Sequence, residues 1–478
     1  MKKLNELYDC NYETEIKGIK MNSKEIEEGD LFICTMGATV DRHDYIEDAI
    51  KRGASAIVVS KDVNYDIPTI KVENTNKELP ILCSKFYDHP DKRIKMLGVT
   101  GTDGKTSVAT IVQTLIGSDL CGYIGTNGRS CSKFNKPTNN TTPDSDKLFM
   151  YFNDFLEAGC KYSMMEASSE AFFYNRLTTL EWDCTGYTNI TSEHLNHHKT
   201  LENYIDCKLN LFRQTKKDGF CIINKDDEHF SKVKEASNGK VLTYGMGEGN
   251  DLQIVNFDVT PHKTFITFKY QNKEYKIVSP LLGDFNVYNL ACAMLMTLAI
   301  GFDMEYIINN IKNINISGRL DMLDLGQDFY VMVDYAHTPN GITKLLNFVH
   351  TLDINRSIVV IGQAGERDPY KRKTVGKVVC DNASHAIFTY EDPRSEDPVD
   401  IINMMIEDIK DTHNNYEIVI DRSEAIKKAI FMSKKKDIVL ILGKGNETYE
   451  KLKDKVIYFN DIEEAEKYLK ERLEKVEV

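Results

Sequence analysis

Short apolar stretches alternate with amphipathic segments along most of the chain. Apolar runs of five or six residues predict strands at 96–100, 162–167, 185–190 and 220–224. Apolar positions at helical spacing predict helices between them, at 105–117, 146–158 and 203–212. Strands separated by helices are typical of a mostly parallel α/β sheet.

The same alternation starts again near residue 317. Strands are predicted at 330–334, 358–362, 386–390, 417–420 and 438–442, with helices between them and a charged helix at 462–474. This pattern predicts a smaller, doubly wound, Rossmann-like domain. The domain lacks the G-x-G-x-x-G fingerprint, so the pattern implies no nicotinamide cofactor.

Two further segments complete the predicted α/β architecture. Residues 1–92 form an opening unit, with strands at 30–34 and 56–60 and a helix at 45–52. Short alternating strands within 251–280 predict an antiparallel appendage, and helices are predicted at 287–300 and 304–311. We therefore expect three domains: 1–92, 93–316 and 317–478.

Composition narrows the function classes. Of the 478 residues 41% are hydrophobic and 28% charged, which is the balance of an ordinary globular protein. Sixty Lys and Arg against 73 Asp and Glu leave a net charge of −13, which argues against nucleic acid or an anionic membrane as partner. The eleven cysteines are scattered singly and indicate reduced, mostly buried thiols. The N-terminus has no apolar signal segment, and no run is long enough to span a bilayer; we expect a cytoplasmic monomer.

The sharpest local motif is GVTGTDGKTS at 98–107, between a predicted strand and a helix. In a phosphate-binding loop, Gly101 and Gly104 bring backbone N–H groups close to phosphate oxygens, Lys105 neutralises the phosphates and Thr106 offers a hydroxyl to Mg²⁺. Val99 occupies the first glycine position of the general pattern, so the motif is a variant. The alternative is a simple glycine turn before a helix.

Further motifs follow in a fixed order. They are TNNTTPD (138–144), MEASSEAF (165–172), TNITSEHLNHH (188–198), CKLNLF (207–212), LLGDFNVYN (281–289), SGRLDML (317–323), DYAHTP (334–339), GERD (365–368), EDPRSEDP (391–398) and GKGNETY (443–449). With the loop at 98–107, this ordered set resembles the Mur ligase family of ATP-dependent amino-acid-adding enzymes. The C-terminal motifs and the opening segments at 29–46 and 49–59 resemble the members that form the muramoyl tripeptide.

The resemblance implies a carbon–nitrogen ligase of peptidoglycan precursor synthesis. Such an enzyme uses ATP to convert a carboxylate into an acyl phosphate, which an amine then attacks. The expected acceptor is UDP-N-acetylmuramoyl-L-Ala-D-Glu, and the expected amine is a diamino acid. Phosphoryl transfer depends mainly on charge neutralisation, which a loop lysine and Mg²⁺ provide.

The resemblance also assigns residues to ATP and to the metal. The residues implied for ATP binding are Gly101, Thr102, Asp103, Gly104, Lys105, Thr106, Ser107, Asn289, Arg319 and Asp334. Those implied for Mg²⁺ are Thr106, Glu166, His194 and Lys208, with Lys208 carboxylated to a carbamate. Lys105, Glu166, His194 and Lys208 are the implied catalytic residues. A strand-end carboxylate in a surface ion pair is the alternative for Glu166, and a solvated charge is the alternative for Lys208.

The acceptor site implied by the resemblance combines hydroxyls with one guanidinium. Its residues are Ser23, Thr141, Thr142, Ser168 and Arg176. Departures from the family pattern cluster here: Asn22-Ser23-Lys24 stands for D-S-R, Glu170 for a histidine and Tyr174 for a glutamine. These changes leave the reaction class intact but alter the acceptor contacts.

The implied amino-acid site lies in the last domain. Its residues are Arg367, Glu391, Asp392, Pro393, Arg394, Gly443 and Glu447. The family motif for meso-diaminopimelate is D-N-P-R; here Arg394 is retained, and a guanidinium suits the distal carboxylate of that substrate. Asp392 replaces the asparagine and would favour a terminal ammonium instead. Meso-diaminopimelate is therefore favoured, followed by L-lysine, with another diamine such as ornithine remaining open.

Two alternatives remain. One is another Mur-type amide ligase, such as a folylpolyglutamate or cyanophycin synthetase, although residues 19–60 argue against the former. The other is a non-catalytic scaffold or a nucleotide-dependent switch. Retention of the implied catalytic residues together with Thr106 argues against a scaffold.

Overall fold

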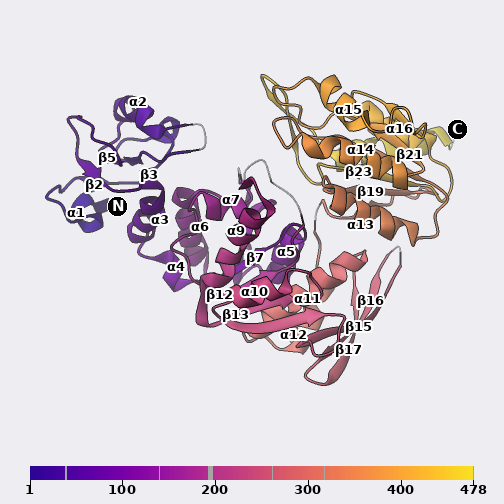
Figure 1. Cartoon of the computed structure of the whole chain (residues 1–478), viewed down its shortest axis with the longest axis horizontal. Coiled ribbons are helices and arrows are strands. Elements are labelled where there is room, and N and C mark those ends of the chain that lie inside the picture. Colours follow the sequence, from indigo (N-terminus) through magenta and orange to yellow (C-terminus); the bar gives the residue numbers. More distant parts are fainter. Residues whose placement is uncertain (38–39, 139, 192–197, 261, 317, 477–478) are drawn as a thin grey trace. The chain divides into compact units, whose positions relative to one another are not determined.

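The computed structural model describes residues 1–37, 40–138, 140–191, 198–260, 262–316 and 318–476 (Figure 1). The chain packs into two compact units. The first comprises Met1–Gln253 with Leu290–Asn310, and the second comprises Ile254–Asn289 with Ile311–Val478. Within the described residues, no helix is long and apolar enough to cross a membrane.

The first unit opens with a small parallel sheet in the order β3 (Ile19–Lys20), β4 (Leu31–Ile33), β5 (Ala56–Val59) and β6 (Thr69–Lys71). Successive side chains of β4 point to opposite faces of this sheet, and both faces are buried. Leu31 and Ile33 join the largest apolar cluster of the unit, while Phe32 joins a second cluster with helix α2 (Ile46–Lys51). The strands and the helix expected in this region are confirmed within a few residues.

The main sheet of the first unit contains a parallel core. From one edge its order is β10 (Phe134–Lys136), β9 (Gly128–Cys131), β8 (Cys121–Gly125), β11 (Tyr162–Glu166), β7 (Lys95–Thr100), β12 (Trp182–Tyr187), β13 (Thr215–Asn224) and β14 (Lys240–Gly245). Neighbours from β8 to β14 pair in parallel, and β9 and β10 are antiparallel. Helices α5 (Lys105–Ile116), α6 (Ser145–Ala158) and α9 (Leu201–Arg213) connect its strands. The prediction of a mostly parallel sheet is confirmed.

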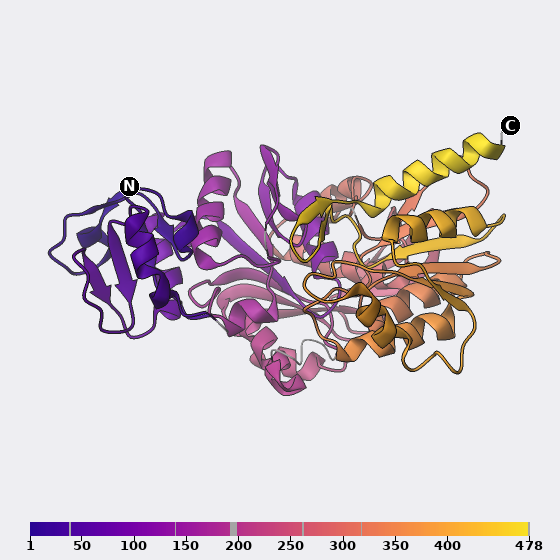
Figure 2. The same ribbon diagram turned by 90° about the horizontal axis from the view of Figure 1, so that it is seen from above.

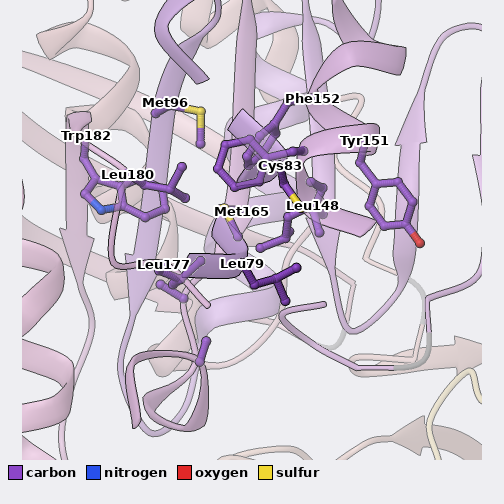
Figure 3. Packing of buried hydrophobic residues seen from close by; sticks show 14 of the residues in the cluster. Leu79, Cys83, Met96, Leu148, Tyr151, Phe152, Met165, Leu177, Leu180 and Trp182 are labelled. Carbon is purple, nitrogen blue, oxygen red and sulfur yellow. The ribbon is translucent and has the colours of Figure 1, made fainter. Parts of the chain in front are cut away.

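The opening layer lies beside the main sheet of its unit (Figure 2), and one continuous apolar core joins the two (Figure 3). Leu79 and Cys83 of helix α3 (Thr75–Phe86) share this core with Phe152 of α6 and Trp182 of β12. Burial of each large apolar side chain contributes about 1.5–3 kcal/mol. The Trp182 ring leaves no room beside β7, because a Cβ on Gly98 would lie 2.8 Å from it. The core therefore fixes β7, the strand that leads into the phosphate loop.

The second unit contains a hairpin and a doubly wound sheet. The hairpin is β16 (Thr264–Tyr270) with β17 (Lys273–Ser279), which confirms the antiparallel appendage. The sheet order is β18 (Asp321–Leu323), β19 (Tyr330–Asp334), β23 (Ile438–Leu442), β20 (Ser357–Ile361), β21 (His385–Phe388) and β22 (Tyr416–Ile418), and every pair except β18–β19 is parallel.

Both faces of this second sheet are covered by helices. Along β23, Ile438, Leu440 and Leu442 pack on one face, while Val439 and Ile441 pack on the other. Helices α13 (Pro339–His350), α14 (Tyr370–Asn382) and α15 (Pro398–Ile406) cover the first face, and α16 (Arg422–Met432) and α17 (Asp461–Val476) cover the second. A strand buried on both faces reads as a continuous apolar run, as the sequence of β23 does.

The structure corrects several sequence-based boundaries. Strand β13 begins at Thr215 rather than at 220, because its polar first half still pairs with β12 at Trp182. Strand β22 ends at Ile418, and helix α11 (Asp284–Ala299) begins three residues before the predicted start. The strands β8, β9 and β10 were not predicted, since they are short and rich in glycine and polar residues.

Candidate active site

The phosphate loop connects β7 to α5, as the motif at 98–107 predicts. Gly104 precedes the helix with φ +86°, a left-handed conformation that glycine adopts without strain. A Cβ on Gly101 would collide with the Thr188 hydroxyl. Both glycines are therefore required by the path of the loop.

The segment after β12 holds this loop in place. The backbone N–H of Thr102 donates to the carbonyl of Asn189 at 2.7 Å, and the N–H of Asp103 donates to Asn189 Oδ1 at 3.1 Å. The Thr188 hydroxyl donates to the Asp103 carbonyl at 2.6 Å. These contacts give Asn189, which sequence reasoning did not assign, a positioning role.

Lys105 folds back over the loop. Its Nζ donates to the carbonyls of Gly101 at 3.0 Å and Thr102 at 2.9 Å. Neutral carbonyls satisfy the hydrogen bonds of the ammonium but do not neutralise its charge. Its contacts therefore suit an anion arriving at the helix N-terminus, where Thr106 and Ser107 lie in the first turn of α5.

Glu166 ends β11 and is fully buried. Its Oε1 accepts hydrogen bonds from the Tyr123 hydroxyl at 2.8 Å and the Thr126 N–H at 2.9 Å, and its Oε2 accepts from the Thr106 hydroxyl at 2.9 Å. A Cβ on Gly125 would collide with Oε1. This environment excludes a surface ion pair and leaves a carboxylate held beside a hydroxyl, an oxygen set suited to a hard cation.

Lys208 lies within α9 and is only 2% exposed. Its Nζ donates to the Gly101 carbonyl at 2.6 Å and lies 4.5 Å from the centre of the Tyr204 ring. The solvated-charge interpretation is therefore wrong, and the structure brings Lys208 to the phosphate loop. His194 lies outside the described residues, so its predicted metal role is untested.

The imidazole of His198, at the end of the motif at 188–198, lies in the interior of the first unit. It is 2% exposed, and its Nε2 lies 3.0 Å from the Ser169 hydroxyl. The rings of Phe173 and Tyr204 pack against its imidazole. His198 is therefore a buried packing residue.

Four of the five predicted acceptor residues gather next to Glu166. The Thr142 hydroxyl donates to the Glu166 carbonyl at 2.7 Å and lies 3.0 Å from the Ser168 hydroxyl. Arg176 donates to the Thr142 carbonyl at 3.0 Å, and the hydroxyls of Thr141 and Thr126 lie 3.0 Å apart. The Tyr174 ring, one of the sequence departures, packs 5.7 Å from the Arg176 guanidinium.

Ser23 lies apart from these four, in the opening layer. Ser23 starts a short 3-10 helix, Ser23–Glu25. Asn22 caps this helix, because its Oδ1 accepts a hydrogen bond from the Lys24 N–H at 3.2 Å. Glu25 forms an ion pair with Lys147 of α6. The departure at Asn22 therefore preserves a helix cap, a role that aspartate and asparagine share.

Arg319 and Asp334 of the predicted ATP set lie around one loop of the second unit. The carboxylate of Asp334 accepts the N–H groups of Leu320 at 2.8 Å and Ala336 at 2.7 Å, which fixes the loop that carries Arg319. The Arg319 guanidinium packs 4.7 Å from the Tyr335 ring. Asn289, on α11, donates from Nδ2 to Asn286 Oδ1 at 2.9 Å.

The predicted amino-acid residues lie on adjacent loops at the carboxyl ends of β20, β21 and β23. Glu366 Oε1 accepts from the Ser395 hydroxyl at 2.6 Å, which joins the loop of Arg367 to the loop of Arg394. Arg367 is exposed, and Arg394 has a left-handed backbone with φ +54°. A Cβ on Gly365 would collide with the carbonyl of Pro393, so the two loops need this close approach.

A buried charge cluster lies beneath these loops. Lys444 is fully buried, and its Nζ donates to Asp392 Oδ1 at 2.8 Å and to Glu447 Oε2 at 3.2 Å. Burial raises the pKa of Glu391 to about 7, opposed by the positive charges of Arg422 and Lys444. A Cβ on Gly443 would collide with the Glu391 carboxylate. Glu391, Asp392, Gly443 and Glu447 are thus brought together.

Lys444 and Tyr335 are functional candidates that sequence reasoning missed. The Tyr335 hydroxyl donates to Glu447 Oε1 at 3.4 Å, while its ring packs against Arg319. Tyr335 therefore joins the predicted nucleotide residues to the predicted amino-acid residues within one unit. The signal for Lys444 is present in the sequence: a lysine between two glycines, directly after a wholly apolar strand.

The chain matches three family models in order. Residues 15–99 match the Mur ligase family catalytic domain, 99–297 the Mur ligase middle domain, and 318–445 the Mur ligase glutamate ligase domain. The matched order is the one in which the motifs occur.

Full-length relatives share about a third of their residues with this chain. A UDP-N-acetylmuramoyl-L-alanyl-D-glutamate–2,6-diaminopimelate ligase of Bacillus licheniformis is 34% identical over 473 residues, covering 97% of this chain and 96% of that protein. The protein of the same name from Clostridium perfringens is 34% identical over 472 residues, covering 96% of each chain.

Solved structures share the fold. A structure of a UDP-N-acetylmuramoyl-L-alanyl-D-glutamate–2,6-diaminopimelate ligase has a TM-score of 0.68 at 26% identity, covering 98% of this chain and 99% of that one. The MurF ligase of Thermotoga maritima in complex with ADP has a TM-score of 0.67 at 18% identity, covering 97% and 98%. At 18% identity, the similarity to the MurF ligase supports only the α/β Mur ligase fold.

Proposed function

The chain belongs to the Mur ligase family, and on this premise we propose that it adds meso-diaminopimelate to UDP-N-acetylmuramoyl-L-Ala-D-Glu at the expense of ATP. The relatives that carry this activity in their names align with almost its whole length. The reaction has two steps. The acceptor carboxylate attacks the γ-phosphorus of ATP and ADP leaves; the amine then attacks the acyl carbon, phosphate leaves and a proton is lost.

One observation carries the proposal: Lys105 and Lys208 both donate to the Gly101 carbonyl, while Thr106 of the same loop donates to buried Glu166. The Lys105 ammonium at the phosphate loop neutralises the charge that develops during phosphoryl transfer. Thr142 and Ser168, next to Glu166, offer hydroxyls for the acceptor. A reaction between a phosphate and a carboxylate requires this proximity.

Mg²⁺ fits the residues that are present. Thr106 and Glu166 place a hydroxyl and a carboxylate 2.9 Å apart, and the donors on Oε1 fix the orientation of the carboxylate. Bound there, Mg²⁺ would neutralise phosphate charge. His194 and a carbamate on Lys208 are the further proposed ligands. A carbamate would turn the buried ammonium into an anion, and the buried position of Lys208 supports such a change.

The contacts of Asp392 favour meso-diaminopimelate over L-lysine. Asp392 would repel a distal carboxylate if it faced the substrate, but its Oδ1 accepts from Lys444 Nζ at 2.8 Å and from the Lys451 N–H at 3.2 Å. Its charge is therefore matched by a buried ammonium. Arg394 has no ion pair among the described residues, and its guanidinium remains for the distal carboxylate.

We propose the remaining assignments on the same basis. The acceptor-binding domain comprises residues 1–92, the ATP-binding domain 93–316 and the amino-acid-binding domain 317–478. The family matches, which meet at 99 and resume at 318, support this division. Arg319 binds phosphate, Asp334 binds the ribose and Asn289 binds the adenine. The residues around the diamino acid are Arg367, Glu391, Pro393, Gly443 and Glu447. The protein acts as a cytoplasmic monomer.

Phosphate release tests the reaction. The purified protein is incubated with ATP and Mg²⁺, with the UDP-muramoyl dipeptide and diaminopimelate added singly and together, and the products are weighed by mass spectrometry. We expect phosphate release only with both added, together with a product heavier by one diaminopimelate residue. ATP hydrolysis without a ligated product would indicate a nucleotide switch, and no hydrolysis at all would indicate a scaffold.

A further inference from the structure

A cavity of about 820 Å³ lies at the amino-terminal edge of the main sheet. Thr215 and Lys216, at the start of β13, line one part, and Leu180 and Glu181, directly before β12, line another. The phosphate loop follows the opposite, carboxyl end of the parallel strand β7. The five steps between the six residues of β7, at ~3.3 Å each, separate the two edges by about 17 Å. The cavity is therefore distinct from the candidate active site.

Another part of the cavity wall comes from the opening layer. Ile81, Ser84 and Lys85 of α3 line it, with Asp91 and Lys92 of the short helix α4 (Pro90–Arg93). Leu180 and Trp182, at the edge of the apolar core, lie next to one another (Figure 3). The cavity thus sits over the joint between the opening layer and the main sheet.

The lining is basic, although the chain as a whole is acidic. Five basic residues face two acidic residues in the lining, against a net charge of −13 for the chain. The basic residues are Lys85, Lys92, Arg213, Lys216 and Lys217, and the acidic residues are Asp91 and Glu181. A local excess of positive charge within a concave surface attracts a compact anion.

Acidic neighbours pair with three of these cations and leave Lys85 and Lys217 without an ion pair among the described residues. Asp206 holds the Arg213 guanidinium at 2.6 Å. Glu181 holds Lys92 Nζ at 2.6 Å, and Asp183 holds Lys216 Nζ at 2.8 Å. The Lys217 side chain is exposed and has no ion-pair partner among the residues that the structure describes. Lys217 is therefore the cation with the most freedom to meet a ligand.

Neutral donors complete the lining. The Thr179 hydroxyl is buried and has no hydrogen-bond partner within the described part of the chain. Gln214 Oε1 accepts from the Trp182 indole N–H at 3.3 Å. The amide NH₂ of Gln214 therefore remains as a hydrogen-bond donor. Ile81 and Leu180 add apolar surface. Charged, polar and apolar groups in one cavity of this volume are typical of a small-molecule site.

We propose that this cavity binds a small phosphate ester. Its phosphate contacts Lys217 and neighbouring basic side chains, and its organic part lies against Ile81 and Leu180. A lysine binds phosphate as a point charge, and a buried hydroxyl and an amide supply oriented hydrogen bonds. Binding there contacts the opening layer and the main sheet at once, so a ligand would stabilise their joint.

Isothermal titration calorimetry on the full chain tests this site. Glucose 6-phosphate and glycerol 3-phosphate serve as probes, and glucose and glycerol serve as uncharged controls. We expect saturable binding of at least one ester and of neither control. Lys217→Glu should weaken that binding at least about tenfold, since it replaces an attraction with a repulsion. The exposed position of Lys217 predicts an unchanged unfolding midpoint.

Two variants distinguish this cavity from other anion sites. Lys276→Glu makes the same charge change at an exposed lysine of β17 in the other unit, and it should bind the ester as the wild type does. Lys105→Ala removes the cation of the phosphate loop and should also bind as the wild type. Absence of binding to either ester, equal weakening by Lys217→Glu and Lys276→Glu, or loss of binding in Lys105→Ala would each overturn the proposal.

Discussion

Two buried carboxylates, Glu166 at the end of β11 in the first unit and Glu391 in the loop after β21 in the second, have opposite environments. Glu166 accepts hydrogen bonds from Tyr123, Thr126 and Thr106, all uncharged donors. Glu391 Oε2 is buried with no hydrogen-bond partner among the described residues, and burial raises the pKa of Glu391 to about 7. Hydrogen bonds fix the orientation of the Glu166 carboxylate, whereas burial favours the protonated form of the Glu391 carboxyl group.

The contrast extends to the surroundings of each carboxylate. The first site is built on backbone groups and hydroxyls at a helix N-terminus, which need no change of protonation to bind a phosphate. The second contains Lys444, Arg422 and several carboxylates, whose desolvation is costly unless their charges are matched. A diamino acid carries ammonium and carboxylate groups together. A dense charge cluster is suited to such a substrate, whereas a loop of backbone N–H groups with a lysine is suited to a phosphate.

The largest expected effect comes from breaking the first site. Lys105→Ala should reduce ligation by at least ~10²–10³-fold, because it removes the cation placed over the phosphate loop. Its hydrogen bonds go only to two backbone carbonyls of its own loop, so the free energy of unfolding should change by about 1 kcal/mol or less. Turnover and urea unfolding measure the two effects, with Lys276→Ala as control. A folded variant with near-normal turnover would remove the phosphate-loop assignment.

Lys208 tests whether the first site also needs an anion. Lys208→Ala should reduce turnover by ~10²-fold or more, and a short carboxylate such as formate should restore part of it by replacing the missing ligand. Wild-type enzyme with the same carboxylate is the control. Carbon-13 NMR in labelled bicarbonate should show a carbamate signal that the variant lacks. A bare ammonium at Lys208 in an active nucleotide complex would contradict the carbamate.

The second site should make stability depend on pH. Glu450, on β24 (Tyr449–Lys451), is a further buried carboxylate near Lys444 and Arg422, and burial raises its pKa to about 7. Between about pH 4.5 and 7 the folded chain keeps a proton that the unfolded chain has released, so the free energy of unfolding falls as pH rises. Glu450→Gln should flatten this fall by an amount on the order of 2 kcal/mol, whereas Glu474→Gln, at an exposed position, should not. Urea unfolding across this window measures the slope; equal slopes in both variants would contradict the account.

The smallest effect is expected at Asp392. Because Lys444 already matches its charge, Asp392→Asn should change the KM for meso-diaminopimelate by less than about threefold. An exposed change, Asp411→Asn, provides the baseline. A KM lowered tenfold in Asp392→Asn would show that the carboxylate repels the substrate after all.

Period-two and helical spacing predicted most of the parallel strands and their helices, because apolar faces must be buried in a fixed register. The same signals missed β8, β9 and β10, whose stability depends on partners rather than on their own apolar residues. The start of β13 was missed for the same reason, since its first residues are polar but pair with Trp182.

The candidate site divides in a similar way. The loop glycines and Lys105 follow from a local motif, since a phosphate loop needs a fixed spacing. The burial of Lys208 and its contact with Gly101 depend on packing between elements about a hundred positions apart, which spacing does not encode. The pairing of Asp392 with Lys444 is also long-range. It removes the reason for expecting Asp392 to favour a terminal ammonium of the substrate.

Competition between two amines tests the central claim most directly. The wild type and Arg394→Ala are each given ATP, Mg²⁺, the UDP-muramoyl dipeptide and equal amounts of meso-diaminopimelate and L-lysine, and the products are quantified by mass. We expect the diaminopimelate product to predominate in the wild type. Arg394→Ala should raise the KM for diaminopimelate at least about tenfold and leave that for lysine nearly unchanged, because only the former loses a carboxylate contact. A wild type that prefers lysine, with a preference that Arg394→Ala leaves unchanged, would contradict the account.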